Sequence, residues 1–146
     1  MEQPLTYRAL EAVGLEAGLD VVGACSAAPF LTARTVIEER KAAGLNGSMQ
    51  FTYRNPARAT DPALTLPGVQ TLVVAACSYH RDPPPRPGSG PVGSVARYVW
   101  ADDQARLIAG LEAVAAALRV AGHRAVVVTD HNNQVDRAAA HRAGRR

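Results

Sequence analysis

The chain has 146 residues, of which 47% are hydrophobic and 20% charged, and its formal net charge is +3. This length allows one domain with a sizeable core, and the composition is that of an ordinary globular chain. No apolar run approaches the roughly 20 residues of a membrane span, and the first residues lack a signal-peptide pattern. The sequence therefore predicts a cytoplasmic protein with no membrane partner, and its small positive charge permits a nucleic-acid partner without requiring one.

The two cysteines, Cys25 and Cys77, exclude several kinds of site. They are far apart and form no C-x-x-C pair, so this segment cannot itself ligate a four-cysteine zinc or iron–sulfur site. Each lies in an apolar run, where a small buried thiol is the favoured interpretation. Nothing in the spacing indicates a disulfide framework.

The beginning of the chain predicts a helix and then a strand. Apolar residues recur at helical spacing across residues 6–17, with Thr6 as a candidate N-cap and Gly18 as the stop. A β-branched run at residues 20–25 predicts a short strand.

The middle of the chain predicts a helix, a strand and a loop. Residues 32–43 form the second helix, which Gly44 ends. Residues 70–79 contain a continuous apolar run that suits a strand buried on both faces. Residues 82–93 hold five prolines and three glycines and predict a loop.

The last part predicts the longest helix, a third strand and a final helix. The long helix covers residues 102–121, starts near Asp102 or Asp103 and stops at Gly122. Its apolar stripe consists of Leu107, Leu111, Val114 and Leu118. Residues 124–129 predict the strand and residues 135–143 the final helix. We therefore expect an α/β layered domain with a small sheet of short buried strands flanked by helices.

Two patterns that could indicate a cofactor site have simpler interpretations. Residues 88–93 match G-x-G-x-x-G but follow a proline run instead of a strand, so they favour a flexible loop over a dinucleotide site. The four histidines have no helical ligand spacing, and His131 with His141 lacks a third ligand, so the sequence predicts no metal site.

Asp130 is the strongest catalytic candidate because it directly follows the third predicted strand. Open α/β sheets bind ligands at the carboxyl ends of their strands. A partly desolvated carboxyl group there has a pKa above its ordinary value of about 3.9 and can donate a proton near neutral pH. The alternative interpretation is that Asp130 only caps the helix that follows.

Several blocks, in this order, resemble the epoxyqueuosine reductase family. They are Gly47-Ser48-Met49-Gln50-Phe51, Arg54-Asn55-Pro56, Arg58 with Leu66-Pro67-Gly68, Val95-Ala96-Arg97-Tyr98, Val128-Thr129-Asp130, and Asp136-Arg137-Ala138-Ala139-Ala140 running to Arg142-Ala143-Gly144. The helix and strand at residues 6–25 also fit the family. Each block is short, and the ordered set is what carries the resemblance.

The resemblance implies a cobalamin-dependent oxidoreductase that removes the epoxide oxygen from epoxyqueuosine in tRNA, the last step of queuosine formation. The family's fold there is an α/β corrinoid-binding domain, followed by a domain with two [4Fe-4S] clusters. Asp130 matches the family's proton donor. Arg58, Ala96 and Arg97 match cofactor-contact positions, with Arg58 suited to donate to amide or phosphate oxygens of the corrinoid.

The chain also departs from the family pattern. Where the family has Asp-Tyr-His, this sequence has Asp102-Asp103-Gln104. Residues 1–144 correspond to an incomplete corrinoid-binding domain, and residues 145–146 to a divergent tail in place of the family's continuation. No cysteine cluster is present, so the [4Fe-4S] clusters would come from a missing domain or a partner chain, and we expect the fragment to be inactive alone.

Two alternatives remain open at this point. One is a non-catalytic remnant that binds cobalamin or tRNA without redox chemistry. The other is a related corrinoid-dependent reductase that acts on a small molecule.

Overall fold

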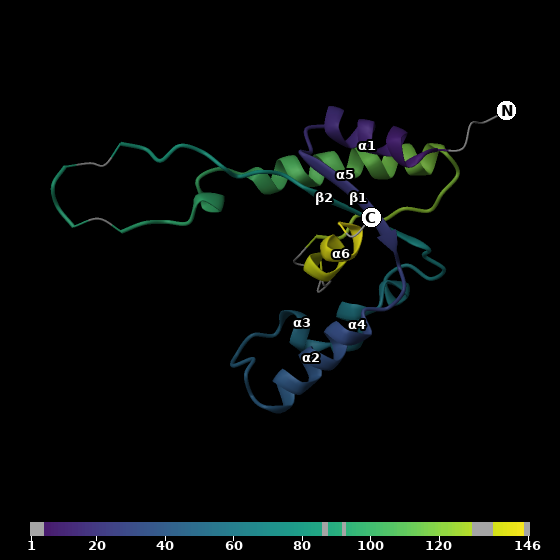
Figure 1. The fold of residues 1–146 in the computed structure, drawn as a ribbon, viewed down its shortest axis with the longest axis horizontal. Coiled ribbons are helices and arrows are strands. Elements are labelled where there is room, and N and C mark those ends of the chain that lie inside the picture. The colour runs from purple at the N-terminus through teal and green to yellow at the C-terminus, as the bar shows by residue number, and fades with distance from the viewer. Residues whose placement is uncertain (1–4, 86–87, 92, 130–135, 145–146) are drawn as a thin grey trace.

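A computed structural model describes residues 5–85, 88–91, 93–129 and 136–144. It is a mixed α/β structure with helices around a two-stranded antiparallel sheet (Figure 1). The helices are α1 (Tyr7–Glu16), α2 (Leu31–Ala42), α3 (Phe51–Arg54), α4 (Pro56–Thr60), α5 (Asp103–Val120) and α6 (Asp136–Ala143), with short 3-10 helices η1 (Pro62–Leu64) and η2 (Arg97–Val99). The strands are β1 (Val21–Ser26) and β2 (Thr71–Ala76).

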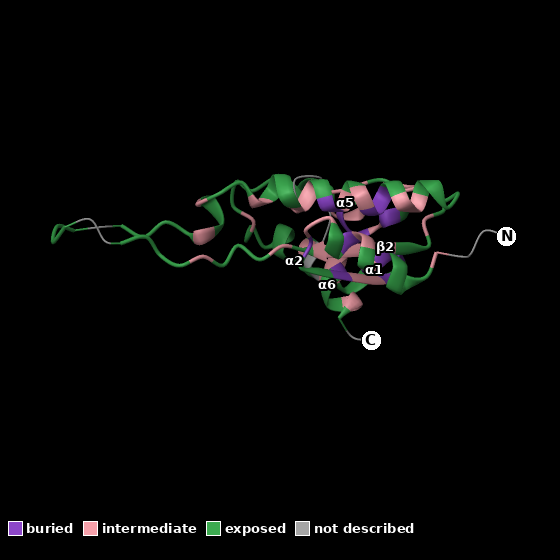
Figure 2. Ribbon diagram, turned by 90° about the horizontal axis from the view of Figure 1, so that it is seen from above, coloured by how far each residue is buried: buried purple, intermediate pink, exposed green. Residues whose placement is uncertain are grey.

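The sheet lies between two helical layers. β1 and β2 pair from Val21 opposite Ala76 to Ser26 opposite Thr71. Because side chains alternate across a strand, Val22 lies on one face, where it packs with α1 and α5. Cys25 lies on the other face, where α6 covers it, and its Sγ donates to the carbonyl oxygen of Ala139 at 3.6 Å. Buried residues therefore gather where the sheet meets these helices (Figure 2).

The caps that the sequence predicted set the ends of α1 and α5. Thr6 Oγ1 accepts from the amide of Ala9 at 3.2 Å, and Asp102 Oδ1 accepts from the amide of Ala105 at 3.0 Å. Gly18 and Gly122 follow these helices with φ of 91° and 83°, a conformation that residues with a Cβ rarely adopt. The predicted helices over residues 6–17, 32–43, 102–121 and 135–143 are thus confirmed to within a residue or so at each end.

The helices α2, α3 and α4 form a small unit that lies below the sheet in the view of Figure 1. α2 has no buried residue, so polar contacts fix it more than apolar packing does. Arg34 Nε donates to Thr60 Oγ1 at 2.9 Å, and Arg34 Nη2 donates to the carbonyl of Ala57 at 3.3 Å. Thr60 is fully buried and its hydroxyl also bonds to the carbonyl of Pro56 at 2.7 Å. This unit positions the end of α4 beside the start of η1.

Two predictions about the sheet are wrong. β2 is half-buried along its middle and exposed at both ends, so it is not buried on both faces. Residues 124–129 form an extended segment without strand pairing, so the third predicted strand is absent from the described part of the chain. The sequence Arg-Ala-Val-Val-Val-Thr has the composition of a strand, but a strand also needs a partner edge.

The proline-rich stretch belongs to a loop, as its composition predicted, and this loop extends away from the rest of the molecule as a long arm (Figure 1). Its described residues have no helix or strand before η2. Among the described helices, none is long and apolar enough to cross a membrane.

Candidate functional site

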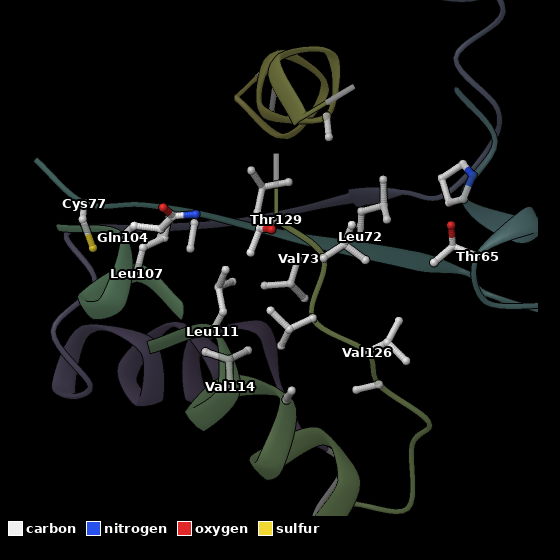
Figure 3. Close-up of a pocket in the computed structure, with 18 of the residues that line it drawn as sticks. Thr65, Leu72, Val73, Cys77, Gln104, Leu107, Leu111, Val114, Val126 and Thr129 are labelled. Carbon is white, nitrogen blue, oxygen red and sulfur yellow. The ribbon is translucent and has the colours of Figure 1, made fainter. Parts of the chain in front are cut away.

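A cavity of about 870 Å³ lies between β2, α5 and the segment 124–129 (Figure 3). Its volume is within the range of roughly 300–1,000 Å³ in which proteins bind small molecules. The wall is mainly apolar, and its polar residues other than the tyrosines are Thr65, Thr71, Asp102, Asp103, Gln104, Arg124 and Thr129. We take it as the candidate functional site because it is large, apolar and bordered by polar groups.

The cavity runs along the edge of β2 that is not paired with β1. Its wall includes Leu72 and Val74 from one face of the strand, and Val73 and Ala75 from the other. Residues of both faces can line one cavity only if it lies beside the strand's edge. Within the described chain this edge has no strand partner. The cavity thus occupies the place of a third strand.

The apolar stripe of α5 forms the floor. Leu107, Leu111, Val114 and Leu118 all line the cavity, as a helix with this spacing predicts. Figure 3 shows Leu111 and Val114 pointing from α5 towards β2. Val114 is buried and Leu111 is half-buried, so the floor is closely packed at Val114 and more open at Leu111.

Two arginines hold the opposite wall, the segment 124–129. Arg119 at the end of α5 donates from Nε and Nη2 to the carbonyl oxygen of Ala125, at 3.2 and 3.0 Å. Arg124 Nη2 donates to the carbonyl oxygen of Pro67. The beginning of this wall is therefore held by arginine side chains. A strand in the same place would be held by backbone hydrogen bonds to its neighbour. The sequence reasoning missed both residues, because their partners are backbone carbonyls that only the fold places nearby.

The base of the arm closes one end of the cavity. Tyr79, Tyr98 and Asp103 line this end, and the two tyrosine rings meet edge to face with centroids 6.4 Å apart. Arg81 donates from Nη1 and Nη2 to the two carboxylate oxygens of Asp103, at 2.6 and 2.7 Å. The hydrogen bond from Arg81, with a smaller contribution from its charge, lowers the pKa of Asp103 despite partial desolvation.

A second ionic cluster ties this end to the sheet. Asp20 Oδ2 accepts from the amide of Ser78 at 2.6 Å and from Arg106 Nη2 at 3.0 Å. The same Arg106 nitrogen also donates to the carbonyl of Ser78 at 3.1 Å. Together with the Arg81–Asp103 pair, these contacts join the side of the arm that leaves β2 to α5.

The residues expected to contact a cofactor lie around the cavity but not in its wall. Arg58 is exposed on α4, and its amide donates to Asn55 Oδ1 at 3.0 Å. Ala96 is exposed and precedes η2. Arg97 is half-buried, with Nη1 3.0 Å from His80 Nδ1 and its guanidinium 5.9 Å from the centroid of the Trp100 ring. Figure 1 draws α4 below the sheet and η2 at the base of the arm, so the structure does not gather these three residues.

Asp130, the predicted proton donor, lies outside the described residues. The sequence predicted that Asp130 follows a strand, but residues 124–129 do not form that strand. Thr129, which precedes it in sequence, lines the cavity.

The predictions for cysteine and histidine side chains can be compared with the described residues. Cys25 is buried as predicted, and Cys77 is only half-buried. His80, His123 and His141 are exposed, and His131 lies outside the described residues. Over the described ranges, no three histidine, cysteine or acidic side chains gather as metal ligands would.

The chemical types of these residues suit cobalamin, but their positions suit it only in part. An apolar wall suits the faces of a macrocycle, and guanidinium groups suit its amide and phosphate oxygens. The cavity, however, is small for a whole cobalamin with its nucleotide tail. Arg58 and Arg97 also do not face one hollow. The cavity could therefore take only part of this cofactor as it stands.

Comparisons with known proteins give no neighbour: no protein-family model, curated protein sequence or solved structure matches this chain.

Proposed function

We propose that this chain is the corrinoid-binding part of an enzyme that resembles the epoxyqueuosine reductases, and that it binds its cofactor at the cavity along β2. One observation carries the proposal. Blocks of sequence that resemble the family, and that are far apart in the chain, contribute wall residues to this single cavity. These residues are Leu66, Tyr98, Val128, Thr129 and Ala139.

The proposal gives each group a role. The apolar wall would hold the part of the macrocycle that fits the cavity. Arg58, Ala96 and Arg97 do not line the cavity and keep the cofactor-contact roles that the resemblance implies, in which the two arginines would donate to peripheral oxygens of the parts that extend beyond it. When bound, cobalamin supplies the electrons for reduction from low-valent cobalt. Asp130 would donate one of the two protons with which the epoxide oxygen leaves as water, and solvent would supply the other. The substrate is epoxyqueuosine in tRNA, and [4Fe-4S] clusters on a further domain or a partner chain supply electrons.

Titration of the purified chain with cobalamin tests this proposal. We expect saturable binding, a change in the visible absorption of the corrinoid, and a melting temperature that rises by roughly 5–10 °C at a hundredfold excess over the Kd. Val126→Gln should weaken binding about tenfold or more because it places an amide in the apolar wall. Val120→Gln is the matched control, since Val120 is 83% exposed and does not line the cavity.

The outcome separates an enzyme fragment from other interpretations. No binding by the wild-type chain, or an equal loss in the two valine variants, would remove the cavity from the proposal. Asp130→Asn should leave cobalamin binding nearly unchanged, because its role is in proton transfer. If activity is reconstituted with an iron–sulfur partner, that variant should abolish turnover. Binding without any reconstituted turnover would indicate a non-catalytic binding module.

A further inference from the structure

The segment 124–129 has the sequence and the chain position of a strand but is not paired as one in the described part of the chain. It follows β2 and α5 in the order of a β-α-β unit, whose second strand normally lies parallel to the first. Arg124, at its start, donates to the carbonyl of Pro67 in the turn that precedes β2, which begins at Thr71. Within the described chain, however, residues 126–128 make no backbone hydrogen bond to another backbone group.

These unpaired groups face a free edge across the cavity. β2 is paired only with β1 in the described chain, so one of its edges offers a row of donors and acceptors. Val126, Val127 and Val128 line the same cavity, and Val126 is 51% exposed. Backbone groups and valine side chains would both gain by pairing with β2. Something must therefore keep the segment away from the strand.

We infer that Arg119 and Arg124 are positioning residues that hold the segment 124–129 away from β2 and so keep the cavity open. Arg119 directs the Ala125 carbonyl towards the end of α5, where Nε and Nη2 both donate to it. Arg124 anchors the preceding residue to the turn at Pro67 and Gly68, whose φ of 79° suits glycine. The inference rests on the proposed function only in taking this cavity as the ligand site.

Loss of both anchors should let the segment close on β2 as a third strand. Closure would fill the space that the cavity now occupies and bury the three valines. Ligand affinity should then fall although neither arginine is assigned a contact with the cofactor. If the two arginines only stabilised the wall, their removal should loosen the segment, and its amides should exchange faster. Closure on β2 should make the same amides exchange more slowly.

Amide hydrogen exchange of residues 126–128, measured without ligand, tests this inference. The wild-type amides should exchange quickly. In the double variant Arg119→Gln/Arg124→Gln they should exchange about tenfold more slowly, as an added opening cost of about 1.4 kcal/mol would produce. Arg8→Gln/Arg40→Gln removes the same charge from exposed positions on α1 and α2 and should leave exchange unchanged.

Further variants keep the test decisive. Glu112→Gln removes the 3.3 Å contact with Arg119 Nη1 and leaves the bonds to Ala125 in place, so exchange should not change. Val127→Pro in the double variant should cancel the slower exchange, because proline removes a donor and disfavours the strand interior. If the double variant does not fold, each single arginine variant should show the same effect to a smaller degree.

Slow exchange in the wild type would overturn the inference, since the segment would already be paired in solution. Faster or unchanged exchange in the arginine variants would overturn it as well. The cobalamin titration of the wild type is an independent measurement. Failure of that titration would reject the proposed function, while the exchange rates would still decide whether the two arginines hold the wall.

Discussion

The contact between Arg81 and Asp103 shows how single residues shape the site. Both carboxylate oxygens of Asp103 accept from the guanidinium, and the pair joins the arm to the first turn of α5. A carboxylate in a helix's first turn also interacts favourably with the helix dipole. The sequence indicated Asp103 only as a possible helix start, because its partner lies 22 positions away across the sheet end.

Asp103→Asn should destabilise the protein at neutral pH, and the difference from the wild type should depend on pH. Arg81 lowers the pKa of Asp103 in the folded state below its value in the unfolded chain. The contribution is therefore fully present above the ordinary pKa of about 3.9 and disappears as the pH falls through the lowered value. Urea unfolding of both proteins between pH 7 and pH 2 measures this difference, with Asp82→Asn as a neighbouring control.

Salt gives a second check on the same pair. Because the contact is partly exposed, added salt should reduce the difference between the wild type and Asp103→Asn without removing its hydrogen-bonded component. A difference that stays constant to pH 2 would contradict an ionised Asp103 as its source.

Close helix packing is the clearest feature at the scale of the elements. A Cβ at Gly110 of α5 would lie 2.5 Å from Leu19 Cδ2, and a Cβ at Gly14 of α1 would lie 2.5 Å from Val22 Cγ2. Leu19 and Val22 are buried. Both glycines thus make room for side chains of the core. Periodicity and caps predicted the helices well, but a buried glycine carries no local signal of its packing role.

Gly110→Ala should destabilise the protein by up to about 2 kcal/mol. Alanine favours a helix by about 1 kcal/mol over glycine, but overpacking a core costs about 1–3 kcal/mol, and Leu19 is only 3% exposed. Ala109→Gly, at an exposed position of the same helix, measures the propensity term alone. Leu19→Val should cost less in the Gly110→Ala background than in the wild type. Additive costs in urea unfolding would show that the contact with Leu19 is not the cause.

At the scale of the whole molecule, local signals predicted more than the pairing of segments. The helices α1, α2, α5 and α6, both observed strands and the proline-rich loop follow from periodicity, caps and composition, whereas the short helices α3 and α4 were not predicted. The antiparallel pairing of β1 with β2 depends on a long connection through α2, α3 and α4, which no local pattern specifies. The third strand was wrong for the same reason: residues 124–129 are suited to a strand, but no local pattern specifies a strand edge with which they pair. The role of Asp130 stays a prediction.

α6 forms the layer on the far face of the sheet, and Arg142 anchors it. Arg142 Nη1 donates to the carbonyls of Ser26 and Ala28 at 2.8 and 2.6 Å, and Nη2 donates to that of Pro29 at 3.4 Å. Its guanidinium lies 3.6 Å from the centroid of the Phe30 ring. Two alanines of α6 also meet β1: the carbonyl of Ala139 accepts from Cys25, and the Cβ of Ala143 faces Gly23. Because alanine buries little apolar area, we expect Arg142 to contribute much of the energy that holds this layer.

Arg142→Met should cost about 2 kcal/mol, because it removes charged hydrogen bonds and a cation–π contact while keeping an apolar stem. Urea unfolding gives the total cost, and amide exchange in α6 shows whether this helix separates before the rest unfolds. Arg142→Lys keeps the charge but not the planar fork, so it should recover only part of the loss. Arg40→Met controls for the removal of an exposed arginine.

If Arg142→Met leaves α6 as protected as in the wild type, the packing of Ala139 and Ala143 on the sheet is sufficient. The far wall of the cavity, to which Phe30 and Ala139 both belong, would then not depend on this residue.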